Sequence, residues 1–186
     1  MGQGFDRKTR ASISLDIAHN RVHEGQLIYG YKLYTAVGGS ATNSLYINTS
    51  DPSFEAHVRL LATVEEKATV TIYRATVAPT APITPVTIRG RKYMDDETAN
   101  AKTKIYEAVT GGTWFEVDKY LIPAGSGNFA VGGQSGNVNE IILNENDWYR
   151  IDFTNDATAQ DLEIRLEFYE VNEAATLTED FGNPAL

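Results

Sequence analysis

The chain has 186 residues, of which 42% are hydrophobic, and carries a formal net charge of −9. A chain of this length can bury about 70% of its unfolded surface in one core, so a single domain is sufficient. The lack of cysteine excludes disulfides and thiolate metal sites, the acidic balance argues against free nucleic acid as a partner, and no stretch has the roughly 18 apolar residues of a membrane span.

The first 11 residues form a polar segment that contains three cations, Arg7, Lys8 and Arg10. They include no apolar stretch of the kind that a secretory signal requires. We expect residues 1–11 to form a flexible N-terminal arm. Its cations are the candidate groups for docking on an acidic surface of a partner.

Period-2 alternation, the pattern of half-buried strands, then dominates the chain. A strand is predicted over residues 13–17, and another over the stretch in which Leu27, Tyr29, Tyr31 and Leu33 share one face. We expect that face of the second strand to belong to the core.

The clearest alternation covers residues 54–65, where His57 and Arg59 lie on the polar face, and it returns in residues 162–168. The shorter candidates are residues 45–48, 68–74, 86–91, 139–144 and 148–154. Together these segments predict about nine strands, which indicates a sandwich or a barrel.

The connections between these strands differ in character. The sequence Gly38-Gly39-Ser40 is suited to a tight turn. Pro79, Pro82 and Pro85 predict a polyproline-like connection that protects a sheet edge.

Three further segments interrupt the strands. Residues 95–104 are the one stretch that favours a short helix, because acidic residues lead and lysines follow. The glycine-rich residues 123–137 predict a long exposed loop. Residues 172–186 lose alternation and are expected to form a C-terminal tail, whose apolar end, with Phe181 and Leu186, is the candidate for self-association. The β-sandwich domain itself is expected to span residues 12–171.

Histidine spacing gives little support to a metal site. His19 and His23 have the i, i+4 spacing that brings two imidazoles together on a helix, but they follow a predicted strand. Four residues of extended chain span about 13 Å, which is too far for one shared ion. Hydrogen-bonded or surface histidines at a strand end are therefore expected.

The acidic clusters at residues 95–97, 144–147 and 155–161 lack the ligand spacing of a calcium loop, so we interpret them as solvated turns. The glycine-rich loop has neither the sequence nor the strand-to-helix context of a phosphate loop. No serine lies in a nucleophile elbow. The chain is therefore predicted to be non-enzymatic, with no cofactor and no metal.

Aromatic residues are more informative, because the chain has 10 tyrosines as well as Trp114 and Trp148. Tyr34, Tyr46 and Tyr73 are predicted to lie opposite the apolar faces of their strands. Partly exposed tyrosines on a sheet are typical of protein interfaces and of sugar-binding surfaces, and they also occur where rings simply cover a sheet.

Several motifs occur in an order that resembles a group of tailed-phage virion proteins. The motifs are the run from His19 to Gly25, Gly38-Gly39-Ser40, His57 in a long strand, Tyr73-Arg74, Gly111-Gly112-Thr113, the glycine-rich loop, Glu140-Ile141-Ile142-Leu143, Trp148-Tyr149-Arg150-Ile151 and Phe168-Tyr169-Glu170. Together they cover about residues 12–171. The resemblance carries over no catalytic residue.

The resemblance implies a jelly-roll-like β-sandwich that cements or decorates the outside of a capsid, made in the host cytoplasm and carried on the virion. The implied partner is the major capsid protein. The chain itself is a second expected partner, in a trimer, whereas nucleic acid and membrane are not expected. Two alternatives remain open: a tail or fibre module that binds surface carbohydrate, and a hydrolase whose site the sequence does not reveal.

Overall fold

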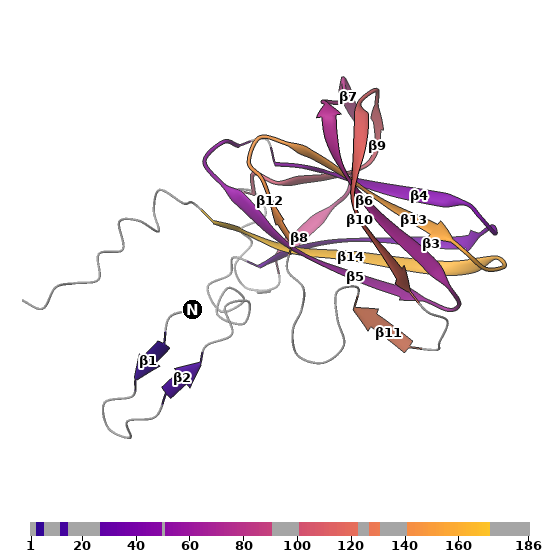
Figure 1. Ribbon diagram of the computed structural model, residues 1–186, viewed down its shortest axis with the longest axis horizontal. Coiled ribbons are helices and arrows are strands. Elements are labelled where there is room, and N and C mark those ends of the chain that lie inside the picture. Colours follow the sequence, from indigo (N-terminus) through magenta and orange to yellow (C-terminus); the bar gives the residue numbers. More distant parts are fainter. Residues whose placement is uncertain are drawn as a thin grey trace, which may run out of the picture.

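The computed structural model describes residues 3–5, 12–14, 27–49, 51–90, 101–122, 127–130 and 141–171. Within these ranges the chain forms strands and no helix. Two sheets with antiparallel pairing pack against each other (Figure 1). The predicted all-β sandwich is therefore confirmed.

Sheet 1 has the strand order β11-β5-β14-β3-β8, and β12 also pairs with β5. Its strands are β3 (Ile28–Val37), β5 (Glu55–Val64), β8 (Ile88–Gly90), β11 (Gly127–Ala130), β12 (Ile141–Leu143) and β14 (Gln160–Val171). The long strands β5 and β14 form its centre, and they pair over ten residues.

Sheet 2 has the strand order β10-β6-β13-β4-β9-β7. Its strands are β4 (Thr42–Asn48), β6 (Ala68–Val77), β7 (Ala81–Pro85), β9 (Lys104–Thr110), β10 (Thr113–Ile122) and β13 (Trp148–Asn155). In Figure 1 this sheet lies above sheet 1, and β7 and β9 project from its upper side.

The strand pairs are nested along the chain. β3 pairs with β14, β4 with β13, β5 with β12 and β11, and β6 with β10. A long antiparallel ribbon folded over in this way gives the strand order of a double-sheet jelly roll. The sandwich is therefore jelly-roll-like, with β7, β8 and β9 added at the sheet edges.

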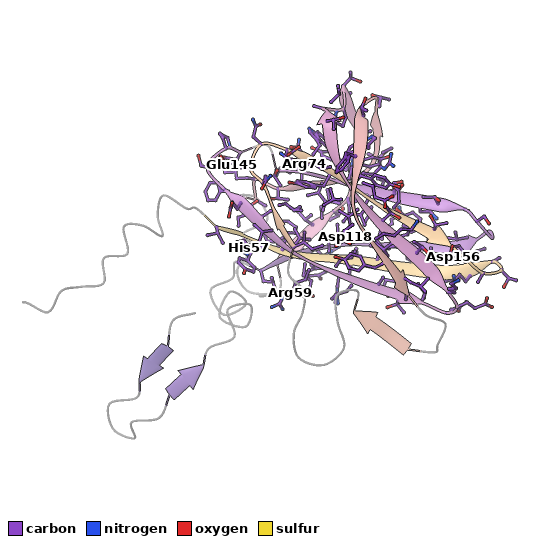
Figure 2. All side chains as sticks on the ribbon, in the orientation of Figure 1. His57, Arg59, Arg74, Asp118, Glu145 and Asp156 are labelled. Atoms are coloured by element: carbon purple, nitrogen blue, oxygen red, sulfur yellow. The ribbon has the colours of Figure 1, made fainter. Side chains whose placement is uncertain are left out.

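The core lies between the two sheets and is built by strict alternation (Figure 2). Along β5 every second residue is buried, from Ala56 to Val64, as the sequence predicts. β13 and the first half of β14 follow the same rule. The largest fully buried side chains are Phe153, Phe168, Leu45, Ile47, Leu60, Leu162, Ile164 and Leu166.

The predicted orientation of β3 is wrong. Tyr31 and Leu33, expected in the core, are 49% and 53% exposed on the outer face of sheet 1. The core side of the strand instead begins with Ile28 and Gly30, both buried. A Cβ at Gly30 would lie 2.9 Å from Cδ1 of Ile105, so the glycine makes room for a core side chain of the other sheet.

Four connections also differ from expectation. The proline segment forms the edge strand β7, with register irregularities around its prolines. β11 lies inside the predicted loop 123–137 and pairs with β5. β9 and β10 were not predicted, and β10 contains a bulge between Glu116 and Asp118 that breaks its alternation.

The expected N-terminal arm, short helix and C-terminal tail are described only in part. β1 (Gln3–Phe5) and β2 (Ser12–Ser14) pair with each other, so part of the expected arm is a β-hairpin. The predicted helix over residues 95–104 falls mostly outside the described residues, and Lys104 begins β9 instead. Residues 172–186 also lie outside them.

Candidate functional site

A row of side chains crosses the outer face of sheet 2 at right angles to its strands. Tyr106 of β9 lies directly opposite Tyr46 of β4. Tyr46 lies opposite Arg150 of β13, and Arg150 lies opposite Tyr73 of β6. Tyr73 in turn lies opposite Glu116 of β10. We call these five residues the transverse row.

Alternation fixes the direction in which the row points. Core residues follow its positions on the two middle strands β4 and β13: Ile47 after Tyr46, Ile151 after Arg150. Successive side chains of a strand point to opposite faces of the sheet. The transverse row therefore faces away from the core, and its three tyrosines are half-buried among their neighbours.

The two tryptophans of the chain lie beside the row on one side, where Trp148 pairs with Asn48 and Trp114 pairs with Ala75. Trp114 lies 5.6 Å from Tyr46, measured between ring centroids, and Trp148 lies 5.6 Å from Tyr106. Tilted ring pairs at this separation are favourable beyond the area that they bury. The row and its two tryptophans therefore form one continuous aromatic surface across β9, β4, β13, β6 and β10.

Arg150 contacts two of the rings on this surface. Its guanidinium carbon lies 4.2 Å from the ring centroid of Tyr73 and 5.3 Å from that of Trp114. Its Nε lies 3.0 Å from Oδ1 of Asp152, which also accepts a 2.7 Å hydrogen bond from Ser44. The cation is thus held between rings and balanced by a carboxylate on the same face, so the surface is ordered without a ligand.

Beside the row, Arg74 pairs with Asp147 through Nε and Oδ2. This hydrogen bond raises the pKa of the Arg74 guanidinium. The other carboxylate oxygen of Asp147 accepts from the backbone of Trp148 at 2.8 Å. The turn at residues 144–147, predicted as a solvated acidic turn, is therefore tied to β6 and to the start of β13.

The second acidic segment, residues 155–161, is less solvated than predicted. Asn155 is fully buried, and its Nδ2 donates to the carbonyl of Val37 at 2.7 Å. Its Oδ1 accepts from Nε2 of Gln160, also buried, at 2.7 Å. This network joins three turns at the Asp156 end of the sandwich, whereas Arg74 lies toward the other end (Figure 2).

The docking and self-association candidates lie outside the described residues: Arg7, Lys8, Arg10, Phe181 and Leu186. The same holds for His19 and His23. His57 lies on β5, where its ring stacks on Tyr169 at 4.9 Å. Among the described residues, no group of three or more His, Asp or Glu side chains is placed to hold a metal ion.

The predicted tyrosine positions are confirmed in part. Tyr46 and Tyr73 lie on the outer face as expected, but Tyr34 packs against the core cluster. Sequence reasoning missed Arg150 and Tyr106 as members of the row. Alternation within β13 indicates that Arg150 points away from the core, but its ring partners follow only from strand register.

No protein-family model matches the chain, and no curated protein matches it. The part of the chain that the structure describes contains no helix long and apolar enough to cross a membrane.

Proposed function

We propose that the chain is a non-enzymatic virion protein that binds the outside of a tailed-phage capsid and cements or decorates the shell. The observation that supports this most is the jelly-roll-like strand order in a chain whose motif order resembles such proteins. Each copy adds a modest contact area, and the lattice multiplies it.

Exposed apolar side chains on the edge strand β10 supply a surface for such a contact. Phe115 and Leu121 are 65% and 61% exposed, and Val117 at the bulge is also exposed. Val77, which pairs with the start of β10, extends the same edge. Apolar side chains exposed along a strand edge suit a protein partner, here the major capsid protein.

The N-terminal cations are the proposed salt-sensitive part of the contact. Arg7, Lys8 and Arg10 lie in the sequence between β1 and β2, so deleting residues 1–11 would remove β1 as well as the charges. Neutral substitutions test the charges alone. The apolar tail end with Phe181 and Leu186 is proposed to join copies of the chain, in a trimer at a capsid threefold position.

The test is co-sedimentation of the full-length protein with capsids emptied of DNA. The variant Phe115→Ser/Leu121→Ser should bind more weakly at every salt concentration. The variant Arg7→Gln/Lys8→Gln/Arg10→Gln should lose affinity at low salt and show a shallower salt dependence.

A matched control neutralises three exposed cations of the sandwich that lie outside β10, Lys67, Arg89 and Lys102. It should bind with nearly the original salt dependence. Full-length protein that fails to bind capsids at any salt concentration would overturn the proposal.

A further inference from the structure

We propose that the transverse row, with Trp114 and Trp148, is a saccharide-binding surface that stacks the sugar rings of an extended, uncharged oligosaccharide. The inference goes beyond capsid attachment, since it assigns a ligand to residues that the proposed docking contacts do not use.

The geometry suits an extended ligand. The row crosses five neighbouring strands from Tyr106 on β9 to Glu116 on β10. Strands are spaced by about 4.8 Å, so the row is about 19 Å long. Several sugar rings placed side by side fit along such a length, with the aromatic rings beneath them.

The chemistry of the face suits a sugar. The apolar C–H face of a pyranose stacks on an aromatic ring, while its hydroxyls need donors and acceptors close by. Polar side chains border the rings on the same outer face: Ser44 and Asn48 on β4. Because Arg150 already holds the rings in place, ligand binding costs little side-chain entropy.

Charge favours an uncharged ligand. The cation at the centre of the surface, Arg150, is paired with Asp152, and its side chain is only 23% exposed. Two exposed side chains of opposite charge lie toward the two edges of this face, Lys104 on β9 and Glu116 on β10. The face therefore offers little unbalanced charge to attract an anion.

A protein partner fits this face less well. The large apolar side chains that are strongly exposed lie outside the row, on the other sheet or toward the β10 edge: Tyr31, Leu33, Val77, Phe115, Val117, Leu121 and Ile142. The rings of the row are amphipathic and half-buried, and their borders are hydroxyl and amide groups. A protein interface would instead have a desolvated apolar centre.

The experiment uses intrinsic fluorescence, because both tryptophans of the chain lie at the surface in question. The full-length protein is titrated with maltohexaose, cellohexaose and N-acetylchitohexaose, and is screened on an array of bacterial surface polysaccharides. We expect a saturable change in tryptophan emission with at least one saccharide, and little change in affinity between low and high salt.

Variants locate the site. Trp114→Ala and Trp148→Ala should each weaken binding about tenfold, the effect of losing roughly one ring-stacking contact. Trp114→Phe should retain most of the affinity, which guards against a folding defect. Tyr31→Ala removes an exposed ring from the outer face of the other sheet, and it should bind like the original protein.

Three results would overturn the inference: no saccharide binds, binding is unaffected by both tryptophan substitutions, or emptied capsids change the tryptophan emission while saccharides do not. The last result would make the row the capsid-docking face. Loss of capsid binding with saccharide binding intact would refute only the proposed function.

Discussion

The guanidinium of Arg150 lies over the ring of Tyr73, 4.2 Å from its centroid, although the two residues are far apart in the sequence. Antiparallel pairing of β13 with β6 places them directly opposite each other on the outer face of sheet 2. A cation held over a ring and desolvated by neighbours is more stabilising than an exposed one. The contact therefore contributes to the fold as well as to the shape of the aromatic surface.

Replacing Arg150 with alanine should lower the free energy of unfolding by about 2 kcal/mol, because the ring contacts and the partner of Asp152 are both lost. Arg74→Ala is the control, since the Arg74 side chain is 49% exposed and its pair with Asp147 should contribute less than about 1 kcal/mol. Urea denaturation measures both. Equal losses of unfolding free energy in the two variants would show that the ring contacts do not stabilise the fold.

Asn155→Ala should be the more damaging change, with a loss of about 3 kcal/mol. The side chain is fully buried, and its removal breaks its hydrogen bonds with the carbonyl of Val37 and with the side-chain amide of Gln160. Thermal unfolding measures the effect. A melting temperature close to that of the original protein would mean that water replaces the amide at no cost.

Two adjacent glycines in the turn between β3 and β4 should respond differently to alanine. A Cβ at Gly39 would lie 2.7 Å from the carbonyl oxygen of Ala157, whereas one at Gly38 meets no atom within 4 Å. Gly39→Ala should cost about 1–3 kcal/mol, because the backbone must move, and Gly38→Ala should stay within about 0.5 kcal/mol. Denaturant midpoints of the two variants compare them, and the reverse order would show that the turn is packed differently.

Stability should fall in alkaline solution. Burial, with a smaller effect from Glu107, raises the pKa of Tyr34 from 10.0 to about 12. Burial and a hydrogen bond to Asp118 raise the pKa of Tyr120 to about 12. Since the folded state binds these protons more tightly than the unfolded state, their contribution is complete below pH 10 and is lost as the pH rises toward 12.

Chemical denaturation between pH 9 and about 12 measures this slope. In the variant Tyr34→Phe the unfolding free energy should fall less steeply with pH, and the remaining fall should come from Tyr120. A slope that is identical in Tyr34→Phe and in the original protein would mean that Tyr34 ionises freely in the fold.

Local sequence pattern located the long strands β3, β5, β6 and β14 but not β10, and it gave the wrong orientation where a single residue reversed the pattern. In β5 every second residue is apolar and buried, so its position and orientation were both predictable. In β3 the face with Tyr31 and Leu33 is the more apolar one, but it lies outside. The buried Gly30 makes room for Ile105 of the opposite sheet, and this contact cannot be predicted from the sequence of β3 alone.

The sequence predicted the outer-face positions of single residues in the transverse row, but not that they lie side by side. Alternation places Tyr46 and Tyr73 on outer faces, because Tyr46 lies between two core residues and Tyr73 follows the buried Ile72. Bringing them to Arg150 depends on the register of β13 with both β4 and β6, which no local pattern contains. In β10 the bulge between Glu116 and Asp118 also broke the alternation that would have revealed the strand carrying Trp114.

The central claim, that this chain decorates a capsid, is tested most directly by counting its copies in purified virions against those of the major capsid protein. Quantitative mass spectrometry of whole particles gives the ratio. A decoration protein should be present at a fixed ratio to the capsid lattice, at one copy per subunit or per local symmetry position. A number that matches only the threefold or sixfold symmetry of a single tail, or absence from the particle, would contradict the account.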